Sequence, residues 1–333
     1  MGQQNLSIPT EFILMRVTKR PELQFPLFGL LLIIYMITLM GNLGMIILTK
    51  VDSRLHTPMY FFIRNLALID LGNATVIYPK VLASLASNQY AISYYGCAVQ
   101  MAIYLVCIIC VLYVLAAMAF DRFVAICNPL LYNVIMSQRL CHVLVGIPYL
   151  ISIFQSVFIT SKTFTSTLCG TNVVSHFYCD GAPFMLLLCS NAREIELIII
   201  TFSGFNVIST LVVILTTYVL ILKAIFRMHS TEGRKKAFST CGSHLTVVVV
   251  FYVSLLYMYL QPESAHSSDN EKIASVFYTL FIPTLNPFIY SLRNKEVKNA
   301  FFMLWKSLCR IGVSSSLSAV NPSGPGDFLL IIP

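Results

Sequence analysis

The feature that most constrains this chain is a series of long stretches without a charged side chain. Six of them are at least 19 residues long: 25–49, 98–120, 143–161, 197–222, 237–262 and 273–292. At 1.5 Å per residue, a helix of this length crosses a hydrocarbon core about 30 Å thick. Only 11% of the 333 residues are charged and 57% are hydrophobic, whereas soluble proteins carry roughly 25% charged residues. The chain is therefore expected to lie in a lipid bilayer.

A seventh apolar stretch, 58–79, is less clear because it contains Arg64 and Asp70. No turn signal divides it, and its neighbours require a return crossing, so we interpret it as a span. Backbone groups in lipid must be satisfied within their own segment, which favours helices over open strands. The predicted fold is an all-α membrane protein: a seven-transmembrane helix bundle.

The distribution of Lys and Arg predicts the orientation. If the N-terminus is outside, 14 of the 22 Lys and Arg residues fall in inner segments, seven fall in outer segments and Arg64 lies within a span. This asymmetry follows the positive-inside rule, so the net charge of +8 reflects topology. The basic residues sit in short loops between spans, which argues against nucleic-acid binding. We expect a multi-pass plasma-membrane protein with its C-terminus in the cytoplasm.

The chain divides into four parts. Residues 1–25 form an extracellular tail in which Asn5-Leu-Ser is a glycosylation acceptor. The tail lacks signal-peptide features, so the first span is expected to act as its own insertion signal. Residues 26–292 form the membrane domain. Residues 293–310 are predicted to be a short amphipathic helix on the inner leaflet, with Cys309 either a palmitoylation site or a free thiol. Residues 311–333 form a cytoplasmic tail rich in Ser, Pro and Gly, predicted to be disordered.

Four of the ten cysteines fall on the outer side, where disulfides can form. Four cysteines allow three pairings, and spacing does not choose among them. The four are Cys97, Cys169, Cys179 and Cys189.

Polar side chains within the spans are costly in lipid and usually functional. They are Asn42, Asp70 and Asn286, with Asp121 and Arg122 at the cytosolic border. Pro283 and Pro287 permit kinks in the last span. Taken singly, each could be a packing device, but Gly41-Asn42, Asp70, Asp121-Arg122-Phe123 and the last-span NPFIY string form an ordered pattern.

That pattern resembles the rhodopsin-like G-protein-coupled receptors, and five longer strings resemble the odorant receptors among them. These are LHTPMYFF (55–62), MAFDRFVAIC (118–127), HFYCD (176–180), KAFSTC (236–241) and PTLNPFIY (283–290). The resemblance covers about residues 5–310. It implies an odorant receptor that binds a small, mostly apolar volatile ligand in the outer half of the bundle. It also implies that the receptor activates a heterotrimeric stimulatory G protein of the olfactory type and raises cAMP.

The resemblance also implies roles for individual residues. Cys97 would pair with Cys179, leaving Cys169 to pair with Cys189. Arg122 would meet the G protein once released from a resting partner, for which we expect Asp121 because no acid begins the sixth span. An inner polar network would contain Asn42, Asp70, Asn286, Pro287 and Tyr290, and could hold sodium or water.

Helical rise predicts the level of the ligand pocket. Tyr104 lies 18 residues before Arg122, about 27 Å toward the outside. The predicted lining at this level is Tyr104, Leu105, Ile108, Ile109, Ser203, Asn206, Val207, Tyr252, Leu255 and Tyr259. No acid lies in the outer half of the third span, so an amine held there by a carboxylate is not expected. An apolar ligand with one hydrogen-bonding group fits better.

Other functions are disfavoured by the sequence. A retinal-binding sensor needs a lysine in the last span, and 273–292 has none. A transporter or channel would need more polar rows along its spans. Cys and His occur at metal-ligand spacing around Cys179 and Cys241, but these lie on opposite membrane faces. We therefore expect no metal site, no cofactor beyond the sodium considered above, and no enzymatic activity, since no nucleophile–base arrangement appears.

Overall fold

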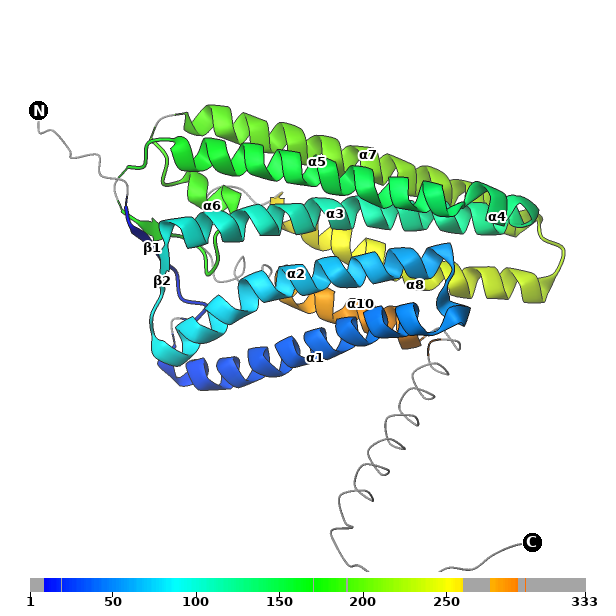
Figure 1. The fold of residues 1–333 in the computed structure, drawn as a ribbon, viewed down its shortest axis with the longest axis horizontal. Coiled ribbons are helices and arrows are strands. Elements are labelled where there is room, and N and C mark those ends of the chain that lie inside the picture. The colour runs from blue at the N-terminus through cyan, green and yellow to red at the C-terminus, as the bar shows by residue number, and fades with distance from the viewer. Residues whose placement is uncertain are drawn as a thin grey trace, which may run out of the picture.

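The structure, a computed structural model, describes residues 9–18, 20–169, 171–189, 191–259, 276–292 and 297. Long helices lie side by side along one axis (Figure 1). They are α1 (Gln24–Val51), α2 (Pro58–Ser87), α3 (Tyr94–Cys127), α5 (Gln138–Thr165), α7 (Ala192–Arg227), α8 (Thr231–Tyr259) and α10 (Ile282–Leu292). A π-helical turn, Phe277–Phe281, precedes α10. These seven elements correspond to the seven predicted spans, which confirms the predicted helix bundle.

The first six of these helices are longer than the apolar stretches in the sequence, because they continue into the flanking residues. Six of them are long and apolar enough to cross a membrane by length and composition, and α2 has the lowest mean hydropathy, 1.3. The described part of the seventh begins at Val276. The low value of α2 agrees with the presence of Arg64 and Asp70 in its sequence. A charge within a span needs a partner or a function.

Short elements connect the spans. At one end they are η2 (Ser53–Leu55), between α1 and α2, and η3 (Pro129–Leu131) with α4 (Tyr132–Ile135), between α3 and α5. At the other end they are η1 (Pro21–Leu23), before α1, and α6 (Gly181–Met185), between α5 and α7. We call the end with α6 the outer end and the end with α4 the inner end, following the predicted orientation.

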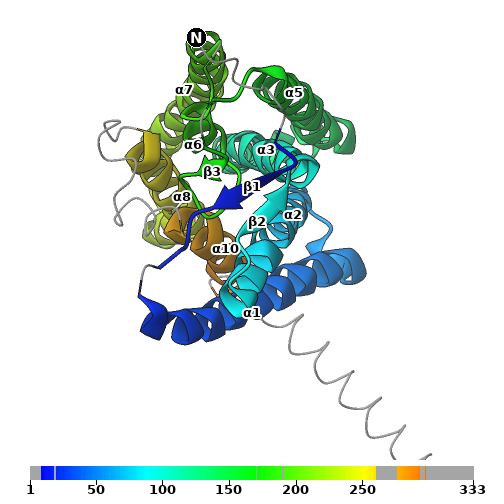
Figure 2. The same ribbon diagram turned by 90° about the vertical axis from the view of Figure 1, so that its left-hand side faces the viewer.

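Helix α3 lies in the middle of the bundle (Figure 2). It packs against α2, α5 and α7 over most of its length. Met101, Leu115 and Met118 are among the largest fully buried side chains. By contrast, α1 and α7 present large apolar side chains outward, as expected where lipid rather than protein covers the helix. Most side chains of α3 therefore contact other helices, and its exposed large apolar side chains, such as Val99 and Ile103, lie in its outer half.

A three-stranded sheet at the outer end was not predicted. Strand β1 (Glu11–Leu14) lies between β2 (Ala91–Ser93) and β3 (Val173–Val174), antiparallel to the first and parallel to the second. Figure 2 shows β1 crossing this end of the bundle. The described part of the N-terminal tail is thus joined by backbone hydrogen bonds to the outer loop between α2 and α3 and to the outer loop between α5 and α7.

Strand β1 alternates between exposed and buried side chains. Phe12 is fully buried, and its ring packs against Tyr94, Phe164 and Phe184. Ile13, the next residue, points the other way and is 42% exposed. Phe12 therefore fixes the tail to the bundle by packing.

We expect Phe12→Ala to lower the free energy of unfolding by about 3–5 kcal/mol, the usual cost of removing a buried aromatic ring. Thermal unfolding of the purified receptor in detergent measures this effect. The matched control is Ile13→Ala in the same strand, expected to change stability by less than about 0.5 kcal/mol. Equal losses in the two variants would contradict the anchoring role of Phe12.

Several predictions lie outside the described residues. They concern the glycosylation acceptor Asn5, the amphipathic helix 293–310 with Cys309, and the tail 311–333. Within that helix only Val297 is described; it is helical and buried.

Candidate functional site

A small cavity lies in the outer half of the bundle, enclosed by α3, α5, α7, α8 and the start of α6. Its volume is about 40 Å³. Its lining includes seven of the ten predicted ligand-binding residues: Leu105, Ile108, Ile109, Ser203, Asn206, Val207 and Leu255. The other lining residues are Leu112, Gln155, Ile159, Asp180, Gly181, Ile199 and Phe202. The structure therefore brings most of the predicted residues together around one space.

The cavity-facing residues follow helical periodicity. On α3 they are Leu105, Ile108, Ile109 and Leu112, which form one stripe of the helix surface. Ile199, Phe202, Ser203 and Asn206 repeat the same spacing on α7. Two stripes of this kind, facing each other, give the cavity its aliphatic and aromatic walls.

Three polar side chains form a network at the inner end of this cavity. The Asn206 amide donates to Gln155 Oε1 at 2.7 Å, and the Tyr113 hydroxyl donates to Asn206 Oδ1 at 2.9 Å. Because Asn206 is buried and already bonded on both sides of its amide, it is poorly placed to bind another group. The Ser203 hydroxyl makes no hydrogen bond with the described part of the chain. Ser203 is therefore the better candidate for contacting a ligand.

Asp180 is a cavity residue that the sequence reasoning missed. It follows Cys179 in the second outer loop and accepts a hydrogen bond from the backbone N–H of Gly181 at 2.7 Å. The absence of an acid from the outer half of the third span does not extend to the cavity, because this carboxylate reaches it from the outer loop. Its position in the HFYCD string, next to a cysteine that the resemblance pairs with α3, was the signal available.

Two of the three tyrosines predicted to line the pocket, Tyr104 and Tyr252, face other parts of the bundle. The Tyr104 hydroxyl lies 3.3 Å from that of Tyr178, and the Tyr104 side chain belongs to a different buried cluster. Tyr252 donates to Thr210 Oγ1 at 2.7 Å. Neither lines the cavity as defined by the described residues. The reason is geometric: rise gives the level of a residue along a helix but not the direction of its side chain. The side chain of Tyr259 lies outside the described residues.

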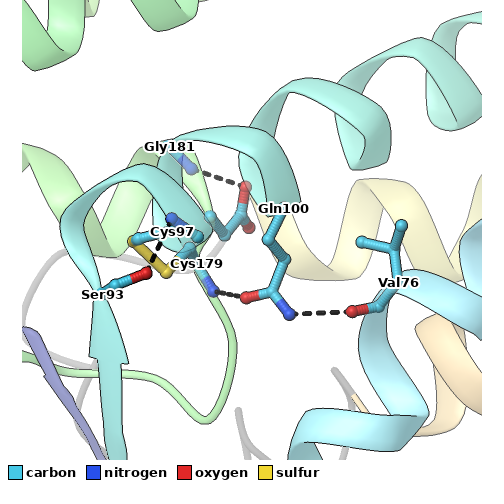
Figure 3. Close-up of a disulfide and its surroundings, with 8 residues drawn as sticks. Val76, Ser93, Cys97, Gln100, Cys179 and Gly181 are labelled. Carbon is cyan, nitrogen blue, oxygen red and sulfur yellow. Dashed lines mark hydrogen bonds between the residues drawn. A yellow bond between two sulfur atoms is a disulfide. The ribbon is translucent and has the colours of Figure 1, made fainter.

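The outer loop that contributes Asp180 and Gly181 to the cavity lining is held by a disulfide, shown in Figure 3. Cys97 on α3 and Cys179 form a disulfide with a Cα–Cα separation of 5.5 Å. A second disulfide joins Cys169 and Cys189, whose Cα atoms are 5.4 Å apart. These are the two pairings that the resemblance implies.

Gln100 reinforces the first disulfide, as Figure 3 shows. Its carbonyl oxygen accepts the N–H of Cys179 at 2.9 Å, and its amide donates to the carbonyl of Val76 on α2 at 2.9 Å. The side chain is buried, so both hydrogen bonds are shielded from water. Gln100 therefore connects α2, α3 and the outer loop at one point.

We expect Gln100→Leu to destabilise the receptor by about 1–3 kcal/mol, because the buried N–H of Cys179 would lose its acceptor. Thermal unfolding in detergent gives the value. Gln89→Leu, at an exposed glutamine of the same end, should leave the midpoint unchanged. An unchanged midpoint in Gln100→Leu would show that this connection contributes nothing.

Farther inside, Asp70 and Asn286 join α2 to α10. The Asn286 amide donates to Asp70 Oδ2 at 2.8 Å, and both side chains are buried. Asn42 instead donates to the backbone carbonyls of Thr38 and Pro283, at 3.0 and 3.1 Å. The predicted inner network is thus two connections from α10, one to α2 and one to α1.

Pro287 and Tyr290 complete the predicted set. A side chain at Gly41 would lie 3.3 Å from the Pro287 ring, so glycine permits the close approach of α1 and α10 at this level. The Tyr290 hydroxyl is buried and has no hydrogen-bond partner in the described part of the chain. A cavity of about 20 Å³ lies beside Asp70, Asn73 and Asn286.

At the inner end of α3, Asp121 is bonded to a loop residue. Its Oδ1 accepts from the Tyr132 hydroxyl at 2.7 Å. Burial raises the pKa of Tyr132, so this hydroxyl stays protonated and remains a donor. Neither Asp121 Oδ2 nor Arg122 Nε has a hydrogen-bond partner within the described ranges. The expected Asp121–Arg122 ion pair is therefore not formed; the carboxylate faces Tyr132 of α4 instead.

Arg122 lies where α3, α7, α8 and α10 meet. It lies near Tyr218, His244 and Tyr290, one from each of the other three helices. The Tyr218 hydroxyl and His244 Nδ1 are 2.7 Å apart, which joins α7 to α8 beside the arginine. A movement of α8 would therefore change the surroundings of Arg122 directly.

Comparison with known proteins identifies similar sequences along most of the chain. A family model described as olfactory receptor matches residues 31–308. Olfactory receptor 8K5 of Homo sapiens is 66% identical over 92% of this chain and all of its own length, and olfactory receptor 8K3 of Homo sapiens is 59% identical over 94% and all of its own. Olfactory receptor 8U3 of Mus musculus is 50% identical over 90% of this chain and 94% of its own length.

Proposed function

The chain belongs to the olfactory receptor family, and we propose that it binds a small, mostly apolar odorant in the cavity between α3, α5, α7 and α8. It is a multi-pass membrane receptor of the plasma membrane and not an enzyme. The observation that carries the ligand proposal is the convergence of seven predicted residues on one enclosed space under the outer loop.

The cavity walls favour a particular ligand chemistry. They are mainly aliphatic, and Ser203 offers a hydroxyl that the described residues leave unbonded. An apolar molecule with one oxygen would match this lining. The volume of about 40 Å³ is far below the roughly 300 Å³ at which small-molecule sites begin, so binding requires the walls to move apart. Coupling ligand entry to separation of α3, α7 and α8 gives a route from binding to activation.

We expect Ser203→Ala to raise the half-maximal concentration of an oxygen-bearing agonist about twofold to tenfold, the worth of one neutral hydrogen bond. Dose–response curves from a cAMP reporter would measure this, using an agonist found by screening an odorant panel. Ser209→Ala on the same helix is the control, because that hydroxyl bonds to the backbone of its own helix. A Ser203→Ala curve identical to wild type would remove Ser203 from the site.

We expect Ile108→Phe to shift preference toward smaller agonists, because the larger ring occupies the cavity without changing its polarity. Ile103→Phe is the control, since Ile103 is 38% exposed on the outward face of α3. The measurement is the ratio of potencies for a short and a long member of one ligand series. A ratio that stays at the wild-type value in Ile108→Phe would place the ligand elsewhere.

For signalling, we propose that the receptor activates a heterotrimeric stimulatory G protein through Arg122 and so raises cAMP. The proposal is supported by the position of Arg122 at the meeting point of four helices, with its Nε unbonded to the described residues. The Asp121–Tyr132 bond holds the neighbouring carboxylate against the second inner loop. Outward movement of α8 would free the Arg122 guanidinium to meet a carbonyl-rich helix end of the G protein.

The orientation that this mechanism needs, with the N-terminus outside and the C-terminus in the cytoplasm, is supported by the excess of Lys and Arg at the inner end.

The small cavity beside Asp70 offers carboxylate and amide oxygens, the ligands that hard cations prefer. We propose that Asp70 and Asn73 hold a sodium ion or a water there.

We expect Arg122→Ala to abolish the odorant-evoked rise in cAMP while surface expression stays near wild type. Surface labelling and the cAMP reporter are measured in the same cells. Arg139→Ala is the matched control, because Arg139 is exposed at the inner start of α5, and it should keep most of the response. A normal response in Arg122→Ala would refute the signalling role.

A further inference from the structure

A second, larger cavity lies at the inner end of the bundle and takes no part in the functions described above. Its volume is about 570 Å³, within the roughly 300–1,000 Å³ typical of small-molecule sites. It is enclosed by the end of α1, the start of α2, the second inner loop and the start of α5. It includes Leu55, His56, Thr57, Pro58 and Phe61 of the LHTPMYFF string.

The charge around this cavity is of one sign. Lys50, Arg64, His56 and His142 line it, and no Asp or Glu does so in the part of the chain that the structure describes. The nearby acid, Asp52, is paired with Arg54 and does not reach the cavity. Neither Lys50 nor Arg64 is paired with a carboxylate of the described residues.

Arg64 is the basic residue within a span that the positive-inside count left unexplained. Its guanidinium lies 5.5 Å from the centre of the Phe61 ring, one turn earlier on α2. His142 packs against the same ring at 5.0 Å. Phe61 thus holds a cation and an imidazole at the wall of one cavity.

Two helix starts add to the positive potential. Thr57 and Pro58 begin α2, Gln138 begins α5, and all three residues line the cavity. The first N–H groups of a helix point outward without intrahelical partners and favour an anion. The Thr57 side chain makes no capping hydrogen bond, whereas at the start of α5 the Ser137 hydroxyl accepts the N–H of Leu140.

The surroundings of the cavity are those of a lipid contact. Leu68, one turn beyond Arg64 on the same face of α2, is 48% exposed, and Val143 and Ile147 are exposed on α5. In the second inner loop, Leu130 is 95% exposed and Val134 is 73% exposed. A molecule in the cavity would therefore have cations around its head and an apolar helix surface beside its tail.

We infer that this cavity is a binding site for the phosphorylated headgroup of an anionic phospholipid of the inner leaflet, with Lys50 and Arg64 as its principal contacts. The inference goes beyond the proposed odorant response and depends on the proposed orientation, which places these residues in the leaflet that carries anionic lipid. Guanidinium and ammonium groups bind phosphate through charge-assisted hydrogen bonds. The apolar rim favours a lipid over a soluble phosphate.

The test uses the full-length receptor purified in detergent and a fluorescent dioctanoyl phosphatidylinositol 4,5-bisphosphate, with binding followed by anisotropy. We expect saturable binding that Lys50→Gln and Arg64→Gln each weaken about fivefold, and the double variant about 25-fold. Arg227→Gln, which removes the same charge from the exposed inner end of α7, should bind like wild type. Arg64→Lys should keep most of the affinity, which separates loss of charge from loss of fold.

Two competitors identify the source of the phosphate. Dioctanoyl phosphatidylcholine should compete poorly, and inositol 1,4,5-trisphosphate should compete more weakly than unlabelled dioctanoyl phosphatidylinositol 4,5-bisphosphate. Equal competition by the soluble trisphosphate would overturn the lipid assignment. Equal loss of binding in Arg227→Gln and Arg64→Gln would overturn the site itself, as would unchanged binding in the double variant.

Discussion

The packing of α3 in the centre of the bundle is the constraint on which both functional ends depend. Buried over most of its length, α3 carries Cys97 and Gln100 at its outer end, the cavity-facing stripe in the middle, and Asp121 and Arg122 at its inner end. A rigid helix fixes the distances between these groups, so changes at one end reach the other through the helices that pack against it. Those helices, α7 and α8, both line the cavity and both approach Arg122.

The sequence predicted the depth of a residue along its helix better than the direction in which its side chain points. Charge-free length predicted the spans, and rise along the helix placed Leu105, Ile108 and Ser203 at the depth where the outer cavity lies. Tyr104 is at the same depth but faces Tyr178, and Tyr252 faces Thr210. The direction of a side chain depends on how its helix is rotated about its own axis relative to its neighbours. In an almost uniformly apolar helix, no polar stripe reveals that rotation.

Contacts between distant segments of the chain could also not be predicted from the sequence. Strand β1 is four residues long and gains its stability from pairing with loops about 80 and 160 residues away. Such short pairings leave little trace in local periodicity. Gln100 is a single amide in an apolar run, and its importance appears only once Cys179 and Val76 are seen on either side. In both cases the energetic reason is the same: a buried backbone or amide group needs a partner.

The inner loop between α3 and α5 connects the inner cavity with Asp121 at the end of α3. Tyr132 bonds to Asp121, and Asn133 and Met136, one and four residues later, line the basic cavity. An anion held between Lys50, Arg64 and the start of α5 would hold the side of the loop that carries Asn133 and Met136, while Asp121 holds Tyr132 on the side facing α3. Loss of either contact would loosen the same short helix. Because the anion and Asp121 would contact the same loop, the fraction of receptors in which the Asp121–Tyr132 hydrogen bond is formed would depend on the charge of the surrounding leaflet.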